Sequence, residues 1–232
     1  MLTYVGAFAP ALPLAAAIVR RPALTPVRKW ILVWCAFVIV ANAVSLYFAL
    51  ESVNNHWLNY VATPVSWMLA LWSLSWCQKS QLAAMWVRLL VPLLAVTWVG
   101  IVFAIESLQT FSLIAEPFAG LLVLGSAIYT LASRAVSERE SLVRQDWLWI
   151  AAGLAIESGA AVALPPMAHW LISKHPTLVI RAYEIRGIFS AVALSAIARG
   201  VTCPTSPLKS GGSSSRASSR SPSSSSASSS RS

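Results

Sequence analysis

The residues of this sequence best placed to do chemistry are ionisable side chains inside long apolar segments. Glu157 lies near the middle of the apolar segment 147–170, too deep for its short side chain to reach a membrane surface. Placing a charged residue at the centre of a membrane helix costs about 2.5–3.5 kcal/mol on insertion scales. We therefore expect Glu157 to hold a proton, to face a hydrated cavity or to meet a cation.

Further ionisable residues accompany Glu157. Glu116 is predicted about two turns inside the segment 108–133, directly before a proline. In the segment 178–198, Arg181 and Glu184 are three residues apart, so they can pair on one face of a helix. Arg186 points away from both at about 100° per residue, which makes it the better partner for a carboxylate on another helix.

These residues allow two interpretations. In the functional one, Glu157 forms the floor of an outward-opening polar pocket to which Glu116, Arg186 and the amide of Asn42 also contribute. In the structural one, the glutamates and arginines form bonds between helices that stabilise their packing. The sequence leaves both interpretations open.

Other kinds of chemistry lack their residues. The segment 178–198 has no lysine for a retinal Schiff base, and Asp146, the single aspartate, is predicted on the side opposite the histidines. The histidines fall at predicted segment boundaries rather than at depth, and the cysteines show no paired spacing; these residues are His56, His169, His175, Cys35, Cys77 and Cys203. We predict no enzymatic activity, no cofactor, no metal site and no disulfide.

The elements that position these residues are predicted to be transmembrane helices. The 232-residue chain is 57% hydrophobic and 11% charged, whereas soluble domains carry about 25% charged residues. A membrane-spanning helix needs roughly 20 predominantly apolar residues. We predict an all-α membrane protein, a bundle of seven transmembrane helices over residues 1–201, with spans at about 4–19, 30–50, 57–76, 83–105, 108–133, 147–170 and 178–198.

The distribution of charge predicts the orientation of this bundle. Basic residues collect at one set of segment ends, and the positive-inside rule places that side in the cytoplasm, with the N-terminus outside and the C-terminus inside. Residues 202–232 are rich in Ser and Arg and are predicted to form a disordered cytoplasmic tail. This distribution explains the net charge of +9 better than nucleic-acid binding does.

Two stretches carry recognisable residue patterns: Asn54-Asn55-His56-Trp57 with Thr63-Pro64, and Trp147-Leu148-Trp149-Ile150 with Glu157-Ser158-Gly159. In these residues the chain resembles an uncharacterised bacterial family of small seven-helix inner-membrane proteins. Val65 or Ser66 stands here where the family often has an acidic residue after Thr-Pro, so a role for that carboxylate does not carry over. The resemblance implies the seven-helix topology and a multi-pass protein of the bacterial inner (plasma) membrane, with no assigned activity.

The sequence thus favours a non-enzymatic membrane protein that binds a small ligand or lipid, or senses conditions, through the outward pocket. One alternative is a small-solute or proton-coupled transporter with Glu157 and Glu116 as proton sites. Another alternative is a structural subunit of a larger membrane complex. The expected partners are membrane lipids, a small molecule or a second membrane protein, and no nucleic acid.

Overall fold

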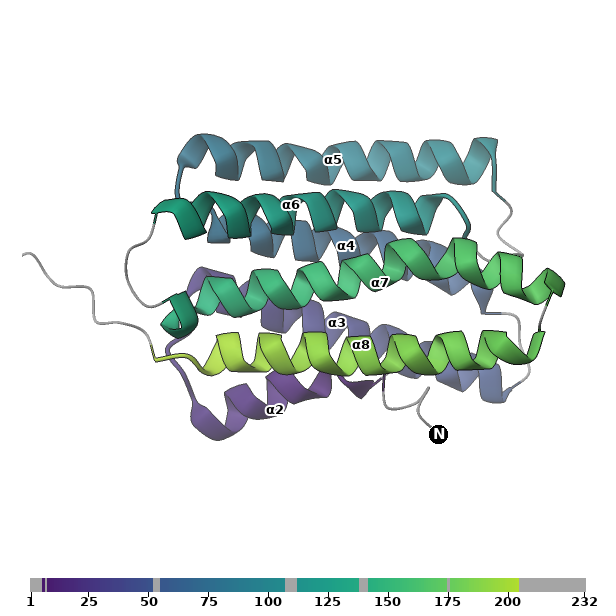
Figure 1. The fold of residues 1–232 in the computed structure, drawn as a ribbon, viewed down its shortest axis with the longest axis horizontal. Coiled ribbons are helices and arrows are strands. Elements are labelled where there is room, and N and C mark those ends of the chain that lie inside the picture. The colour runs from purple at the N-terminus through teal and green to yellow at the C-terminus, as the bar shows by residue number, and fades with distance from the viewer. Residues whose placement is uncertain are drawn as a thin grey trace, which may run out of the picture.

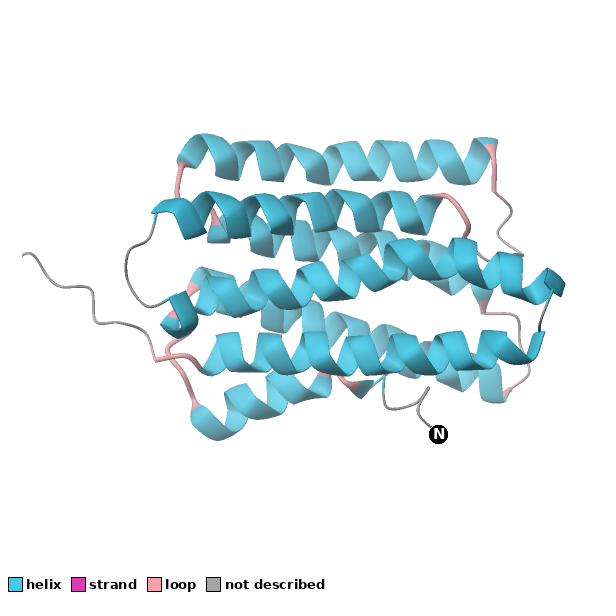
Figure 2. Cartoon of the chain, in the orientation of Figure 1, coloured by secondary structure: helices cyan, strands magenta, loops and turns pink. Residues whose placement is uncertain are grey.

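The computed structural model describes residues 6, 8–51, 55–106, 112–137, 142–174 and 176–204, and these residues form an all-helical bundle without strands (Figures 1 and 2). Its elements are α2 (Ala11–Arg20), α3 (Pro26–Leu50), α4 (His56–Cys77), α5 (Gln81–Ala104), α6 (Ala115–Ser137), the 3₁₀ turn η1 (Leu142–Arg144), α7 (Asp146–Lys174) and α8 (Pro176–Thr202). The predicted all-helical architecture is confirmed. The predicted tail after Pro204 lies outside the described residues.

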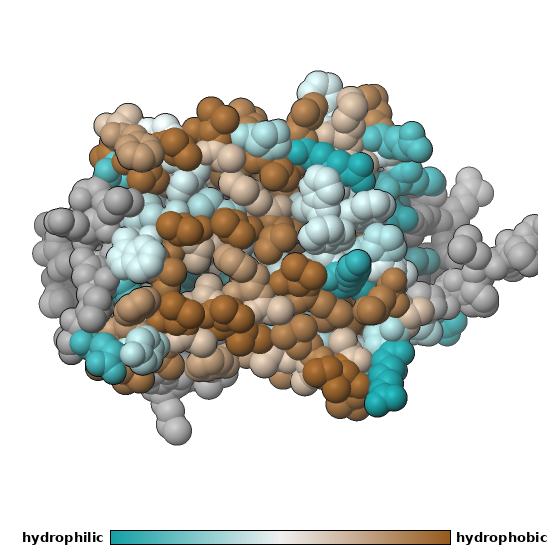
Figure 3. Space-filling view, turned by 180° about the vertical axis from the view of Figure 1, so that it is seen from behind, coloured by the Kyte–Doolittle hydropathy of each residue, from teal (hydrophilic) through white to brown (hydrophobic). Residues whose placement is uncertain are grey.

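Five of these helices, α3, α5, α6, α7 and α8, are long and apolar enough to cross a membrane. Apolar side chains cover the middle of the face in Figure 3, and hydrophilic ones collect mainly toward the right-hand end of that view. We call the end at which α3, α5 and α7 begin the basic end, because it carries Arg28, Lys29, Lys79 and Arg199. These features define a multi-pass membrane protein.

Helix α4 has 22 residues, but it does not reach the apolar character of the five helices named above, because Asn59, Thr63, Ser66 and other polar residues interrupt it. It packs against α3, α5, α6 and α7, so neighbouring helices rather than lipid surround much of its surface. Polar groups at membrane depth are tolerated where protein or a cavity surrounds them. The central position of α4 therefore explains its composition.

The prediction of one continuous helix over residues 4–19 is wrong. The chain turns at Ala9–Pro10, and α2 begins only at Ala11. The Pro10 ring fixes its own φ, and the missing N–H of Pro13 is tolerated only in the first turn of a helix, so a helix start is favoured here. With 10 residues, α2 is about 15 Å long, half the thickness of the hydrocarbon core.

The predicted start of the fifth span at residue 108 is also wrong, because Ser112–Ile114 are not helical and α6 begins at Ala115. The Glu106 carboxylate accepts the backbone N–H groups of Leu113 and Ile114 at 2.8 and 2.6 Å, which satisfies donors that the start of a helix leaves free. Glu116 therefore lies in the first turn of α6, not two turns inside it. In Figure 1 this end of α6 stops short of the neighbouring ends of α5 and α7.

Helices α7 and α8 share the most extensive contact among the helices that the structure describes, and glycines allow their backbones to approach. A Cβ atom on Gly153 of α7 would lie 2.5 Å from the backbone oxygen of Ala193 on α8. A Cβ on Gly200 would lie 2.9 Å from the backbone oxygen of Asp146. Small residues that let helix backbones approach are a common device of membrane helix packing. This packing brings the polar residues of α7 and α8 side by side.

At the basic end, Arg28 ties three helices together. Its side chain is 1% exposed, and Nη2 donates to the carbonyl oxygen of Cys203, after α8, at 2.7 Å. Nη1 donates to the carbonyl oxygen of Ala23, and Nε forms an ion pair with Asp146 of α7 at 3.2 Å. In the sequence, Arg28 is only one of several basic residues at the ends of the apolar segments, whereas in the structure it is a packing residue.

Candidate polar cavity between α3, α4, α7 and α8

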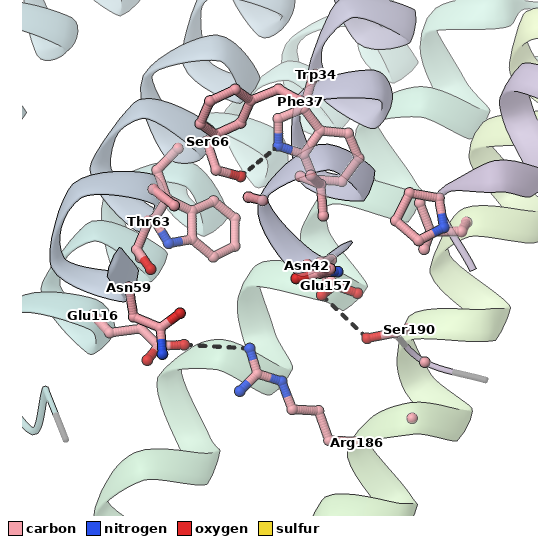
Figure 4. A pocket seen from close by; sticks show the side chains of 18 of the residues that line it. Trp34, Phe37, Asn42, Asn59, Thr63, Ser66, Glu116, Glu157, Arg186 and Ser190 are labelled. Atoms are coloured by element: carbon pink, nitrogen blue, oxygen red, sulfur yellow. Dashed lines mark hydrogen bonds and ion pairs between the residues drawn. The ribbon is translucent and has the colours of Figure 1, made fainter. Parts of the chain in front are cut away.

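A cavity of about 320 Å³ lies among α3, α4, α7 and α8 (Figure 4). Its position follows from the shortness of α2, which packs between α8 and α3 but begins only after the Pro10 turn. Among the described helices, α3 makes little direct contact with α7 or α8, so a space remains beyond α2. Gly6 closes one side of it, so near α8 that a Cβ on Gly6 would lie 2.9 Å from Gly187 Cα.

Two residues of the cavity lining form an ion pair. Arg186 Nη2 on α8 lies 3.2 Å from Glu116 Oε1 on α6, and the two side chains are 29% and 22% exposed. Figure 4 shows both side chains pointing toward each other. The late start of α6 places Glu116 in the first turn of that helix, where the N-terminal dipole also favours a negative charge.

Glu157 on α7 is held differently. Its Oε1 accepts a hydrogen bond from Ser190 Oγ on α8 at 3.1 Å, as Figure 4 shows. Its Oε2 is buried and has no hydrogen-bond partner in the part of the chain that the structure describes. A buried polar atom without a partner costs free energy and is rare in folded proteins. Glu157 therefore has a binding capacity that the described protein groups do not fill.

The charges around the cavity do not balance. Its described lining contains two carboxylates, Glu116 and Glu157, and one cationic side chain, Arg186. Since Arg186 is engaged with Glu116, the charge on Glu157 needs another compensation. In a membrane interior, that compensation is a proton or a positively charged partner.

The remaining walls combine polar and aromatic groups. Asn42 and the aromatic rings of Trp34 and Phe37 come from α3, while α4 adds a row of polar side chains. Trp34 Nε1 donates to Ser66 Oγ at 2.9 Å, which fixes the indole against the polar row. Ligand sites of membrane and soluble proteins commonly pair apolar walls with a few placed polar groups, in volumes of about 300–1,000 Å³.

The α4 row was missed in the sequence analysis, although a signal for it was present. Asn59, Thr63 and Ser66 recur at intervals of four and three residues, which places them on one helix face. Polar residues at this spacing within an uncharged helix indicate a face that neighbouring helices or a cavity must cover.

The structure brings four of the six predicted site residues together and leaves two outside. Asn42, Glu116, Glu157 and Arg186 line the cavity. Arg181 is exposed and Glu184 is half-buried, and neither belongs to the lining. The reason is helical geometry, because the cavity face of α8 carries 183, 186, 187, 190 and 194, from which 181 and 184 are rotated away.

No group of three or more His, Cys, Asp or Glu side chains that could hold a metal ion occurs in the described ranges. Cys35, Cys77 and Cys203 are free and buried. The side chains of His56 and His169, and all of His175, lie outside what the structure describes.

Comparison of the chain with protein-family models, with curated proteins and with solved structures finds no match.

Proposed function

We propose that this protein is a seven-span inner-membrane protein, with its basic end in the cytoplasm, that binds a small molecule in the cavity between α3, α4, α7 and α8. In this topology α3 to α8 each cross the membrane, and the N-terminal segment that contains α2 makes the remaining crossing from outside. The positive-inside rule supports the orientation. The resemblance of the Asn54–Pro64 and Trp147–Gly159 stretches to a bacterial family supports the location.

The observation that carries the binding role is Glu157 Oε2, buried at the cavity and unpaired among the described residues. A carboxylate kept only for packing should have its oxygens satisfied by protein groups, because a half-satisfied buried group destabilises the fold. Glu116 fits that packing role through its ion pair with Arg186. Glu157 does not, so a bound molecule supplies the better reason for its presence.

A filled cavity tests this proposal. Ala62 lines the cavity from α4, whereas the adjacent Val61 is 58% exposed and faces away from it. We expect Ala62→Phe to abolish the thermal stabilisation that small molecules give the purified protein, and Val61→Phe to preserve it. The measurement is the shift in Tm of the full chain in detergent across a library of small molecules of varied charge.

Two results would contradict the binding role. One is a library in which no compound stabilises the wild-type protein. The other is stabilisation of equal size in Ala62→Phe and wild type, which would place the ligands elsewhere.

A further inference from the structure

We propose that the cavity binds a monovalent organic amine, whose ammonium group replaces a proton that Glu157 holds when the cavity is empty. This inference rests on the proposed binding function and names the chemical class of the ligand. The exchange is balanced: the neutral Glu157 carboxyl releases one proton to water, and its carboxylate then pairs with the ammonium. The net charge of the site is the same before and after the exchange.

The charges that face Glu157 support this exchange. Arg186 and Tyr183 face it from α8 and Glu116 faces it from α6, while the described parts of α2, α3 and α4 contribute no titratable group to the lining. Arg186 can neutralise only one of the two carboxylates, and its Nη2 is directed to Glu116 at 3.2 Å. One further positive charge makes the site neutral, and a proton or an ammonium group supplies it equally well.

The groups around Glu157 favour an ammonium over a divalent metal ion or an anion. A metal ion such as Mg²⁺ or Ca²⁺ takes six or more oxygen ligands, and the described residues include no cluster of acidic, His or Cys side chains that could hold one. An anion would need a free cation, but Arg186 is already paired. An ammonium group has three donors, which suit the unpaired Glu157 Oε2 and nearby neutral oxygens.

The walls favour an organic amine over ammonium itself. Trp34, Phe37 and Trp67 give the cavity an aromatic side, and Asn42 and Thr63 give it polar groups. Aromatic faces attract cations within about 6 Å and also bury apolar carbon, so a ring-bearing amine gains from both effects. The volume of about 320 Å³ accommodates a molecule of that size.

The test compares amines with uncharged molecules of the same shape. The probes are 2-phenylethylamine and tryptamine, each matched with its alcohol, 2-phenylethanol or tryptophol, added to the full chain in nanodiscs. We expect larger Tm shifts with both amines than with their alcohols. Titration calorimetry in buffers of different ionisation enthalpy should show release of about one proton per amine bound, since the amine displaces the proton on Glu157.

Two variants separate charge from shape. Glu157→Gln keeps the shape of the protonated side chain, and we expect it to remove both the preference for amines and the proton release. Glu51→Gln removes an exposed carboxylate at the end of α3, outside the cavity lining, and should leave both unchanged. If Glu157→Gln does not fold, the proton release of the wild-type protein decides alone.

The outcomes distinguish this inference from the proposed function. Equal binding of amines and alcohols, lost in Ala62→Phe, would keep the ligand cavity and overturn the amine. Amine binding without proton release would also overturn it, as would a library whose cavity ligands are all uncharged or anionic. Absence of any cavity ligand would overturn the proposed function itself.

Discussion

Glu116 and Glu157 carry the same chemical group, but their surroundings give them different roles. Glu116 lies in the first turn of α6 and pairs with Arg186 at 3.2 Å. Glu157 has one oxygen bonded to Ser190 and one buried oxygen without a partner among the described groups. The first arrangement stabilises helix packing, and the second leaves room for a proton or a ligand.

This difference predicts effects of different size for the same substitution. Glu116→Gln leaves the Arg186 guanidinium without its carboxylate and should lower the free energy of unfolding by roughly 1–3 kcal/mol, between the values for exposed and fully buried pairs. Glu157→Gln resembles the protonated side chain and should change stability by less than about 1 kcal/mol. Reversible unfolding of both variants in mixed micelles at neutral pH measures the two values. A larger loss for Glu157→Gln than for Glu116→Gln would assign the packing role to Glu157 instead.

Cys203, just after α8 at the basic end, gives a prediction of pH dependence. Burial raises the pKa of its thiol, and the neighbouring Arg28 and Arg199 offset this only in part. The folded protein therefore holds the thiol proton more tightly than the unfolded chain does. The resulting stability is present at neutral pH and falls as the pH rises above about 8.5, the ordinary thiol value.

Labelling kinetics measure how tightly the folded protein holds the proton of the Cys203 thiol. A maleimide should react with Cys203 in the folded protein more slowly than with a free thiol at neutral pH, since the thiolate is the reactive species. The rate should rise as the pH is raised. Cys35 and Cys77 are buried within α3 and α4, so Cys35→Ala and Cys77→Ala variants isolate the signal. Labelling as fast as a free thiol would contradict the burial of Cys203.

At the scale of elements, the position of each helix in the bundle explains its composition. Helix α4 tolerates polar residues because α3, α5, α6 and α7 surround it. Helix α2 is short because Pro10 and Pro13 set its start, and its shortness leaves the cavity between α3 and α8. Helices α7 and α8 approach closely because Gly153 of α7 and Gly200 of α8 each face the backbone of the other helix.

The α7–α8 contact predicts different results at two glycines of one helix. Gly153→Ala would place a Cβ 2.5 Å from the Ala193 oxygen, so the helices must separate, and we expect a loss of about 1–3 kcal/mol, as for other overpacked cores. Gly159 of the same helix has open space around it. Gly159→Ala should be neutral or stabilising by up to about 1 kcal/mol, because alanine favours the helix. Thermal unfolding of the two variants compares them; equal effects would argue against the close contact.

At the scale of the whole molecule, the buried Arg28 network joins the start of α3, the start of α7 and the end of α8 at the basic end. Removing one member of a buried charged network leaves its partners unpaired, so we expect Arg28→Gln to cost about 3–5 kcal/mol. Lys29 is the matched control, because it is adjacent and exposed. Lys29→Gln should have little effect on Tm, and a similar loss in both variants would mean that net charge rather than the network matters.

The orientation across the membrane is a second whole-molecule prediction. A reporter that is active only in the periplasm, fused after Lys209, should be silent, because the basic end and the tail are proposed to lie in the cytoplasm. A fluorescent cytoplasmic reporter at the same position is the control and should be bright. Periplasmic activity at this position would reverse the proposed topology.

Much of the fold was predictable, because apolar length determines where membrane helices form. Six predicted spans overlap α3 to α8. The predicted boundaries are wrong at Pro10, before α2, and at the start of α6, where the Glu106 carboxylate accepts backbone N–H groups. At each of these places a single side chain overrides the apolar pattern. The site was predictable in part. Glu157, Glu116, Arg186 and Asn42 were found because polar residues at membrane depth are conspicuous, whereas Asn59 and Ser66 were missed because their roles depend on which helices surround α4.

The sequence alone determined that the chain forms apolar helices with a basic side, since hydropathy and charge act along the chain and need no partner. Only the tertiary structure decided which carboxylate meets Arg186 and which is left with an unpaired oxygen. The physical reason is that pairing depends on distances between different helices. Those distances are determined by side-chain packing, here by the glycines between α7 and α8 and by the short α2.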